Sequence, residues 1–415
     1  MFIHRNITKQ LLGALATAPI VLLNGARQTG KSTLTQWISK QMNFEYITLD
    51  NYTVLDSLKR DPLGFLSNFK NPLVVDEIQR VPDAFLAFKQ IIDQDRRSGK
   101  FLLTGSANIF MLPKLADSLA GRMEILTLWP FSCDELRGFQ TNFIDSLFSK
   151  SLFKKSIQQY SFNDLLRTII AGGYPEIQKL KSDERRNSWF NSYITTILQR
   201  DIRDFSRIEG IQELPRLLML LASRSGSLLN MSNVSRDSGL VLMTLKRYVS
   251  LLEATFLVKR LPAWFTNIGK RLVKMPKIYL TDTGLLCHLL DADQNRLRRD
   301  PMMLGKVLEN FVMQELFKQA EWSKIRPRVY FYRSAAGKEV DFILENRGGQ
   351  IVAIEVKSST GVDSKDLKGL IELREALGER FIRGIVIYTG QEIIPLGTKL
   401  QAMPVQALWR RDDKK

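Results

Sequence analysis

The sequence predicts an α/β protein whose first third folds around a parallel sheet. Short apolar runs alternate with helix-like stretches over the first 130 residues, which is typical of buried strands joined by crossover helices. The composition is that of an ordinary globular chain, with 44% hydrophobic and 25% charged residues among 415. A chain of this length accommodates about three domains. It holds no run of about 18 apolar residues, so no membrane span is expected.

The first expected domain covers residues 1–130 and contains five strands. Their ranges are 20–23, 46–50, 72–76, 100–106 and 124–128. One helical stretch runs from Lys31 towards Lys40, and another places Phe85, Phe88 and Ile92 on one face. The alternation predicts that all five strands lie in one buried sheet.

The next two expected domains are mainly helical. Residues 131–210 are expected to be helical, and the long amphipathic run over 187–205 lacks glycine and proline. Residues 211–300 are expected to form a winged-helix-like domain, with helix-turn-helix spacing over 232–252 and a strand at 256–259. Helices that simply pack together explain that spacing equally well.

The last expected domain, residues 301–410, returns to mixed structure. Helices are expected at 305–318 and 364–377. Strands are expected at 329–333, 339–345, 351–357 and 385–388. The overall expectation is therefore an α/β chain with a parallel sheet first, helices in the middle and a second α/β domain last.

The net charge and the small number of cysteines and histidines indicate which partners and which kinds of site the protein could have. The chain carries 60 Lys and Arg against 43 Asp and Glu, a net charge of +17. This excess fits a polyanionic partner such as nucleic acid, an acidic membrane surface, or solubility alone. Two cysteines (Cys133, Cys287) and two histidines (His4, His288) exclude a disulfide framework and a Cys/His zinc cluster. The apolar stretch at 11–23 is interrupted by polar residues, so export is not expected, and the cytoplasm is the expected compartment.

A phosphate-binding loop follows the first strand. Residues 25–32 match G-x-x-x-x-G-K-[ST] in full, between an apolar strand and a helix. The glycines let backbone amides surround phosphate oxygens, Lys31 reaches the outer phosphates, and Ser32 binds Mg²⁺. The expected nucleotide-binding residues are Gly25, Ala26, Arg27, Gln28, Thr29, Gly30, Lys31, Ser32 and Thr33.

Two further strands end in polar residues that suit the same site. Asp76 ends the third strand and is expected to bind Mg²⁺ with the nucleotide, and Glu77 to polarise the attacking water. The fourth strand ends in Thr104 and Ser106, one of which is expected to contact the outer phosphate. The carboxyl ends of parallel strands lie at one edge of a sheet, where ligands bind.

These motifs resemble the AAA+ ATPases, in the prokaryotic branch with Asp-Glu after the second apolar strand. The resemblance implies ATP hydrolysis with Mg²⁺ in a homo-oligomer, with a hexameric ring as one form. It implies that Arg122 acts as an arginine finger on a neighbouring subunit's nucleotide, although a surface arginine is the plainer interpretation. It implies that residues 131–210 form a helical lid, in which Arg200 and Arg203 are the candidates for a sensor arginine. Further pieces that resemble the branch are residues 119–122, 129–132 with Glu135, 172–176 and 200–202.

A second constellation lies in the last domain. A hairpin turning at 347–349 would bring Asp341 beside Glu355 and Lys357, which share one face of a strand. Asp341 and Glu355 are expected to bind Mg²⁺ or Mn²⁺, Lys357 to position a water, and Glu309 to add a carboxylate from a helix. These residues would form a phosphodiesterase site.

The constellation resembles the PD-(D/E)XK nuclease core, and also the C-terminal domain of unknown function found in this ATPase branch. Val340 stands where the name-giving motif has proline. A solvated surface hairpin, or a degenerate nuclease fold that only grips DNA, remain alternatives.

Three functions remain open on the sequence. The first is an ATP-driven machine acting on nucleic acid, with DNA as the favoured partner, no membrane, and a metal-dependent nuclease domain. The second is an ATP-operated switch whose last domain binds DNA or protein without cutting. The third is a protein-remodelling ATPase. Basic residues expected at phosphates are Lys246, Arg247, Arg298 and Arg299.

Overall fold

The computed structural model describes residues 2–106, 119, 121–139, 143–149, 160–201, 211–267, 269, 271, 274–334 and 336–409, with the backbone alone at 200, 201 and 211. The chain forms two compact units. The N-terminal unit comprises Phe2–Phe131 with Glu253–Phe256, and the C-terminal unit comprises Ser132–Leu252 with Leu257–Lys415. The finer boundaries expected near residues 210 and 300 stay predictions.

The N-terminal unit is a parallel five-stranded sheet, as expected. The strand order is β2-β3-β4-β1-β5, and every neighbouring pair is parallel. The strands are β1 (Ile20–Asn24), β2 (Glu45–Thr48), β3 (Leu73–Asp76), β4 (Phe101–Gly105) and β5 (Met123–Thr127). β1 lies between β4 and β5, so the loop that follows it opens near the middle of one sheet edge.

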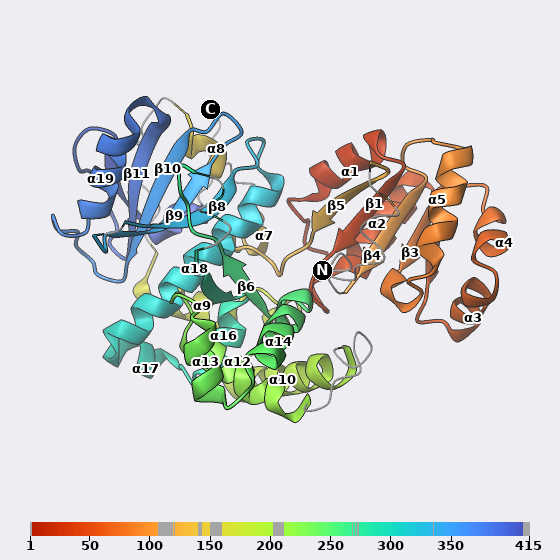
Figure 1. Ribbon diagram of the computed structural model, residues 1–415, viewed down its shortest axis with the longest axis horizontal. Coiled ribbons are helices and arrows are strands. Elements are labelled where there is room, and N and C mark those ends of the chain that lie inside the picture. The colour runs from red at the N-terminus through yellow and green to blue at the C-terminus, as the bar shows by residue number, and fades with distance from the viewer. Residues whose placement is uncertain are drawn as a thin grey trace. The chain divides into compact units, whose positions relative to one another are not determined.

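Helices cover both faces of this sheet (Figure 1). Val21 and Leu23 pack with α1 (Thr8–Thr17) and α2 (Lys31–Met42), whereas Ile20 and Leu22 pack in the core on the other face. That second core includes α3 (Tyr52–Arg60), α4 (Pro62–Ser67) and α5 (Ala84–Gln94). Alternate side chains of a strand point to opposite faces, so a run of consecutive apolar residues is buried on both sides.

The region expected to form a lid contains short helices in the C-terminal unit. They are α7 (Cys133–Leu136), α8 (Phe143–Leu147), α9 (Phe162–Ala171) and α10 (Asp183–Thr196). The helix expected at 187–205 begins earlier, and at Ile197–Asp201 it becomes a π-helix. The Gly172–Glu176 motif has a structural contact: Gly173 N donates to Asp282 Oδ2 at 2.7 Å, and Asp282 also caps α16 (Thr283–Leu289).

The winged-helix expectation matches the observed order of elements. Helices α12 (Leu214–Ser223), α13 (Met231–Ser238) and α14 (Leu242–Ala254) precede the antiparallel pair β6 (Val258–Leu261) and β7 (Lys277–Leu280). Leu228, between α12 and α13, forms an antiparallel bridge with Lys277. One helix, one bridging residue, two helices and an antiparallel strand pair follow the order of elements in a winged helix, and we call residues 214–280 the winged helix. The sequence did not predict β7.

The last part of the C-terminal unit is a mixed six-stranded sheet of order β12-β13-β11-β10-β9-β8. Its strands are β8 (Arg328–Arg333), β9 (Glu339–Glu345), β10 (Ile351–Lys357), β11 (Phe381–Tyr388), β12 (Ile394–Pro395) and β13 (Leu400–Pro404). α18 (Pro301–Trp322) packs against β10, and α19 (Lys368–Leu377) packs against β11 (Figure 1). The β9–β10 hairpin is confirmed, with Ile354 opposite Phe342.

Shorter elements complete the description. They are η1 (Ile78–Arg80), η3 (Ile177–Lys179), η5 (Ile211–Glu213), α17 (Gln294–Arg299), η6 (Gly378–Arg380) and η7 (Val405–Trp409). Among the described helices, none combines the length and the apolar character that crossing a bilayer requires.

Candidate nucleotide site and carboxylate cluster

The loop between β1 and α2 folds around the Lys31 side chain. Lys31 Nζ donates to Gly25 O at 2.9 Å and to Ala26 O at 2.8 Å, and the side chain is buried. Gly30, with a φ of +93°, is the N-cap of α2 and brings no side-chain oxygen to the first amides of the helix. The uncapped first amides of α2 and the lysine therefore belong to one loop, as a bound phosphate requires.

Close backbone packing fixes the start of this loop. A Cβ on Gly25 would lie 2.2 Å from Leu128 O, and Gly25 has a φ of +151°. Only glycine fits that approach. The other nucleotide-binding residues of the prediction follow in order, with Thr29 Oγ1 donating to Ala26 O at 2.9 Å. Ser32 is half-buried at the start of α2 and Thr33 is exposed.

Arg5, for which the sequence predicted no role, hydrogen-bonds the backbone of the phosphate loop. Its Nη1 donates to Thr29 O at 2.7 Å and its Nη2 to Trp129 O at 2.6 Å. Its guanidinium lies 4.5 Å from the centre of the Phe131 ring. The buried arginine thus joins the loop to the segment after β5, and no local motif signals this contact.

The end of β3 presents Asp76 at the same sheet edge. Tyr46 OH donates to Asp76 Oδ2 at 2.9 Å, and the Thr104 hydroxyl donates to Asp76 Oδ1. Burial raises the pKa of Tyr46, and the charge of Asp76 raises it further, so the phenol stays a hydrogen-bond donor. Two hydroxyl donors thereby orient the carboxylate.

Glu77 follows in a left-handed conformation with a φ of +63°. Its N–H donates to Thr104 Oγ1 at 3.0 Å, and its carboxylate accepts from Ser106 Oγ at 3.2 Å and from the Gln79 amide. The same amide donates to Ser106 Oγ at 2.8 Å. The structure therefore brings together the predicted Asp76, Glu77, Thr104 and Ser106, and it adds Gln79, whose only sequence signal is its place two residues after Glu77.

Arg122 lies at the opposite edge of the sheet. Its carbonyl accepts from Ile20 N at 3.2 Å, where β1 begins, and its Nε donates to Asp93 Oδ1 at 2.6 Å. The loop over 25–30 follows the other end of β1, about 16 Å away along a five-residue strand. Arg122 therefore does not reach the loop of its own chain.

Other predicted residues lie outside the described residues. Arg203 belongs to this group, as does the side chain of Arg200.

The second constellation also comes together in space. Asp341 Oδ2 accepts from Val356 N at 2.9 Å across the β9–β10 hairpin. Lys357 Nζ lies 2.9 Å from Glu355 Oε1 and 3.4 Å from Asp366 Oδ1. We call Glu309, Glu339, Asp341 and Glu355 the carboxylate cluster.

A lysine that the sequence did not single out lies within this cluster. Lys277 Nζ is 2.8 Å from Glu339 Oε1, 3.0 Å from Glu309 Oε1 and 3.5 Å from Asp341 Oδ1. Its side chain is only 3% exposed. The Tyr279 hydroxyl donates to Glu309 Oε1 at 2.6 Å. The sequence feature that could have identified Lys277 is its position as a charged residue at the start of the otherwise apolar strand Lys277–Leu280.

Burial dominates the electrostatics of the cluster. It raises the pKa of both Glu309 and Glu355 well above the ordinary value, and the charge of Asp341 raises them further. Burial by itself would lower the pKa of Lys277, but the charges of Asp341, Glu309 and Glu339 raise it, so the ammonium stays protonated.

The expected metal set of Glu309, Asp341 and Glu355 does not fit this arrangement. Among the residues that the structure describes, no three Asp, Glu, His or Cys side chains form a group that could hold a metal ion. Glu309 and Asp341 instead share the Lys277 ammonium. A cation contributed by the chain itself takes up the carboxylate oxygens that a metal would need.

Comparison with known proteins extends these observations. The profile of an AAA domain matches residues 17–137, and two profiles of domains of unknown function match residues 162–296 (DUF8612) and 304–408 (DUF4143). The uncharacterized protein Rv2008c of Mycobacterium tuberculosis is 30% identical over 410 residues, which covers 98% of this chain and 84% of that protein. The chain belongs to the family of Rv2008c.

Two further proteins are similar to this chain. The uncharacterized protein MJ1544 of Methanocaldococcus jannaschii is 24% identical over 351 residues, covering 81% of this chain and 74% of its own length. The Walker-type ATPase PABY2304 of Pyrococcus abyssi has a solved structure that is 16% identical, with a TM-score of 0.45, covering 70% of this chain and 96% of that chain.

The AAA match assigns an AAA domain to residues 17–137 of this member of the Rv2008c family. The matched segment contains all five strands of the N-terminal sheet, the phosphate loop and the Asp76–Glu77 edge. The other two profiles describe domains of unknown function, so the carboxylate cluster is interpreted from its own geometry.

Proposed function

We propose that this protein hydrolyses ATP with Mg²⁺ and uses the reaction to act on nucleic acid, DNA in the first place, as a cytoplasmic homo-oligomer. One observation carries the ATP part: the Lys31 loop after β1 and the Asp76–Glu77 pair after β3 lie at the same edge of one parallel sheet. Phosphate donors and acidic residues at that edge are what nucleotide hydrolysis needs.

The roles follow from the contacts. Lys31 and the first amides of α2 bind the outer phosphates, and Ser32 and Asp76 supply oxygen ligands for Mg²⁺. The metal, when bound, neutralises charge on the phosphates. Glu77 accepts a proton from the attacking water, and Ser106 holds the Glu77 carboxylate in place.

Arg122 supports an oligomer. It lies at the sheet edge opposite the loop of its own chain, so it can act only on the nucleotide of a neighbouring subunit. A closed ring, for which six subunits is our proposal, presents one such arginine to every nucleotide site.

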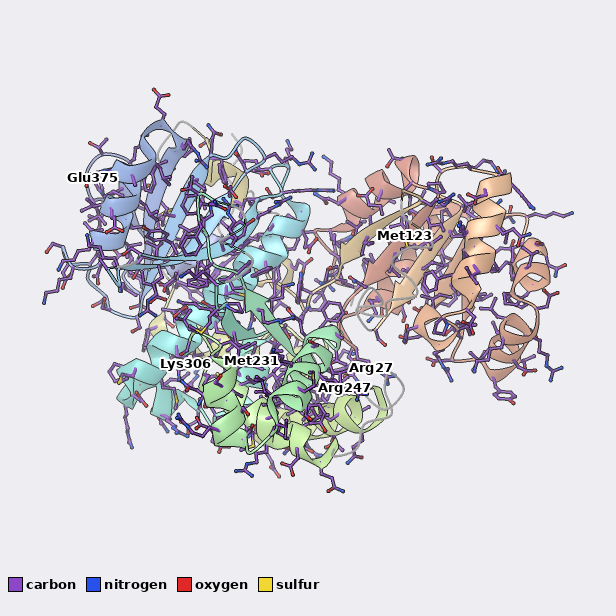
Figure 2. The ribbon with its side chains drawn as sticks, in the orientation of Figure 1. Arg27, Met123, Met231, Arg247, Lys306 and Glu375 are labelled. Atoms are coloured by element: carbon purple, nitrogen blue, oxygen red, sulfur yellow. The ribbon has the colours of Figure 1, made fainter. Side chains whose placement is uncertain are left out.

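The winged helix supports nucleic acid as the partner. Arg236 on α13 and Lys246 and Arg247 on α14 are exposed, and Figure 2 shows Arg247 projecting from α14 with Met231 on the neighbouring helix. Arg298 and Arg299 are exposed at the end of α17. Together with a net charge of +17, these side chains suit phosphate contacts from a helix-turn-helix unit.

Two candidate functions remain for the last domain. Convergence of Asp341, Glu355 and Lys357 supports a metal-dependent nuclease, as the sequence predicts. The Lys277 ammonium inside the cluster favours the alternative, in which the domain binds without cutting. Incubating the purified full chain with single- and double-stranded DNA and RNA, with Mg²⁺ or Mn²⁺ and with or without ATP, separates them: cleavage lost in D341A supports the nuclease.

DNA-dependent ATP turnover tests the proposed function as a whole. We expect DNA to raise the ATPase rate, and the variant R236A/K246A to lose most of this stimulation while keeping its basal rate. K59A, at an exposed lysine on α3, is the control. DNA affinity should fall steeply with salt, because phosphate contacts release counterions. An ATPase rate that neither DNA nor RNA changes would contradict a nucleic-acid partner.

A further inference from the structure

We propose that the Lys277 ammonium is the resident cation of the carboxylate cluster, in the place where a nuclease-like core would hold a divalent metal. The inference goes beyond the proposed ATPase and concerns the C-terminal unit alone. It assigns to Lys277 a role that neither sequence motif predicts, and it implies that the last domain binds its partner without metal-dependent cleavage.

The first argument is the match of donors to acceptors. A lysine ammonium has three N–H donors and no acceptor. Three carboxylates lie around Lys277 Nζ, those of Glu339, Glu309 and Asp341, at 2.8, 3.0 and 3.5 Å. A Mg²⁺ ion requires oxygen ligands at about 2.0–2.1 Å in near-octahedral geometry. The ammonium therefore occupies one oxygen of Glu309 and one of Asp341, two residues that a metal there would need, and the other oxygen of Asp341 accepts from Val356 N.

The second argument is charge. A buried carboxylate without a partner is strongly destabilising, so each member of the cluster needs a cation or a proton. Lys357 serves Glu355 and the neighbouring Asp366. Among the described ion pairs, Glu309, Glu339 and Asp341 share Lys277. Displacing this lysine would leave three carboxylates to be neutralised at once.

The third argument is that Lys277 cannot easily move away. Its backbone pairs with Leu261 of β6 on one side and with Leu228 on the other. Its ammonium lies 5.7 Å from the centre of the Phe331 ring, and a Cβ on Gly226 would lie 3.1 Å from the Glu309 carboxylate. The backbone of Lys277 is thus fixed within the winged helix, whereas its ammonium pairs with carboxylates of the following α/β domain. The cluster therefore connects the winged helix to that domain.

Mn²⁺ binding tests the inference on the full chain. Isothermal calorimetry with Mn²⁺ alone is compared between K31A, which weakens the nucleotide site, and K31A/D341N. We expect the same Mn²⁺ stoichiometry for both, because Asp341 holds the ammonium. A Mn²⁺ site present in K31A and lost in K31A/D341N overturns the proposal.

Thermal unfolding in EDTA gives a second, independent readout. K277M should lower Tm by about 10 °C, because three partly buried carboxylates lose their cation. K277R, which keeps the charge, should lower it less, and K277M/E309Q/D341N should recover most of the loss. A Tm of K277M equal to that of the wild type overturns the proposal.

If K277M yields no folded protein, the triple variant is decisive. Recovery of folded protein supports the proposal, and failure of the triple variant as well overturns it. ATP hydrolysis by K277R, measured in parallel, separates the two claims: failure of the Lys277 proposal leaves hydrolysis at the Lys31 site untouched.

Discussion

Ser106 Oγ donates to Glu77 Oε2 at 3.2 Å, so the end of β4 holds the acidic side chain that follows β3. Gln79 reinforces the contact by donating to both residues. These hydrogen bonds fix the orientation of the carboxylate, and they depend on the two neighbouring strands β3 and β4 keeping their register.

The first prediction concerns this contact. E77Q should bind ATP normally and hydrolyse it about 10²–10⁴-fold more slowly, because an amide cannot accept the proton of the attacking water. S106A, which loses only the orienting hydroxyl, should show a smaller loss in kcat. Steady-state hydrolysis with parallel nucleotide-binding measurements checks both. Equal kcat in E77Q and wild type would remove Glu77 from the mechanism.

Lys31 should be essential for ATP turnover without being essential for folding. Its ammonium donates to two carbonyls of the loop, Gly25 O and Ala26 O, and a bound phosphate would be a further partner. K31A should abolish hydrolysis and leave the circular dichroism spectrum unchanged. K40A, an exposed lysine near the end of the same helix, should behave like wild type. Turnover that persists in K31A would mean that ATP is hydrolysed elsewhere.

Replacing Gly25 and Gly13 by alanine should have opposite effects on the stability of the protein. G25A places a Cβ 2.2 Å from Leu128 O and should displace the loop, lowering ATP affinity and Tm. G13A adds a Cβ with nothing within 4 Å in the middle of α1, and should stabilise the chain by about 0.5–1 kcal/mol. Differential scanning fluorimetry with and without ATP compares the pair, and a G25A protein with wild-type ATP affinity would contradict the tight packing.

Arg122 should act between subunits. R122A and K31A should each be nearly inactive alone, whereas mixing them should restore part of the ATPase rate, since a mixed oligomer joins an intact loop to an intact arginine. Rate is measured against mixing ratio, with R96A, on the same side of the sheet, as the control. No recovery at any ratio would indicate a monomeric enzyme or a role limited to the Asp93 ion pair.

Acid should destabilise the C-terminal unit through Glu345. Partial burial by itself would raise the pKa of Glu345, but hydrogen bonds from Arg271, at 2.5 and 3.0 Å, and from Trp264 lower it below the ordinary value. The stabilisation is therefore present above the unfolded-state pKa of about 4.3 and is lost as pH falls through the lower folded-state pKa. E345Q should show a smaller fall in Tm between pH 5 and pH 3 than the wild type. The reason is that the variant takes up roughly one proton fewer when it unfolds in acid. An unchanged pH slope would mean that other carboxylates control acid unfolding.

The sequence by itself determined the features that are local in the chain. The phosphate loop is eight consecutive residues, the central strands of the first sheet are short apolar runs, and the β9–β10 hairpin turns within a few residues. Side-chain periodicity and glycine conformation act over such short distances, so the positions of Lys31, Asp76, Asp341, Glu355 and Lys357 could be predicted as sites.

Tertiary structure alone decided which distant side chains meet. Arg5 contacts Trp129 O across 124 positions, and Lys277 reaches Asp341 across 64. Neither contact follows from periodicity, because it depends on how separately formed elements pack. The exchange of an expected metal for a lysine ammonium has the same cause: the cation comes from β7, a strand that only the folded winged helix places beside the cluster.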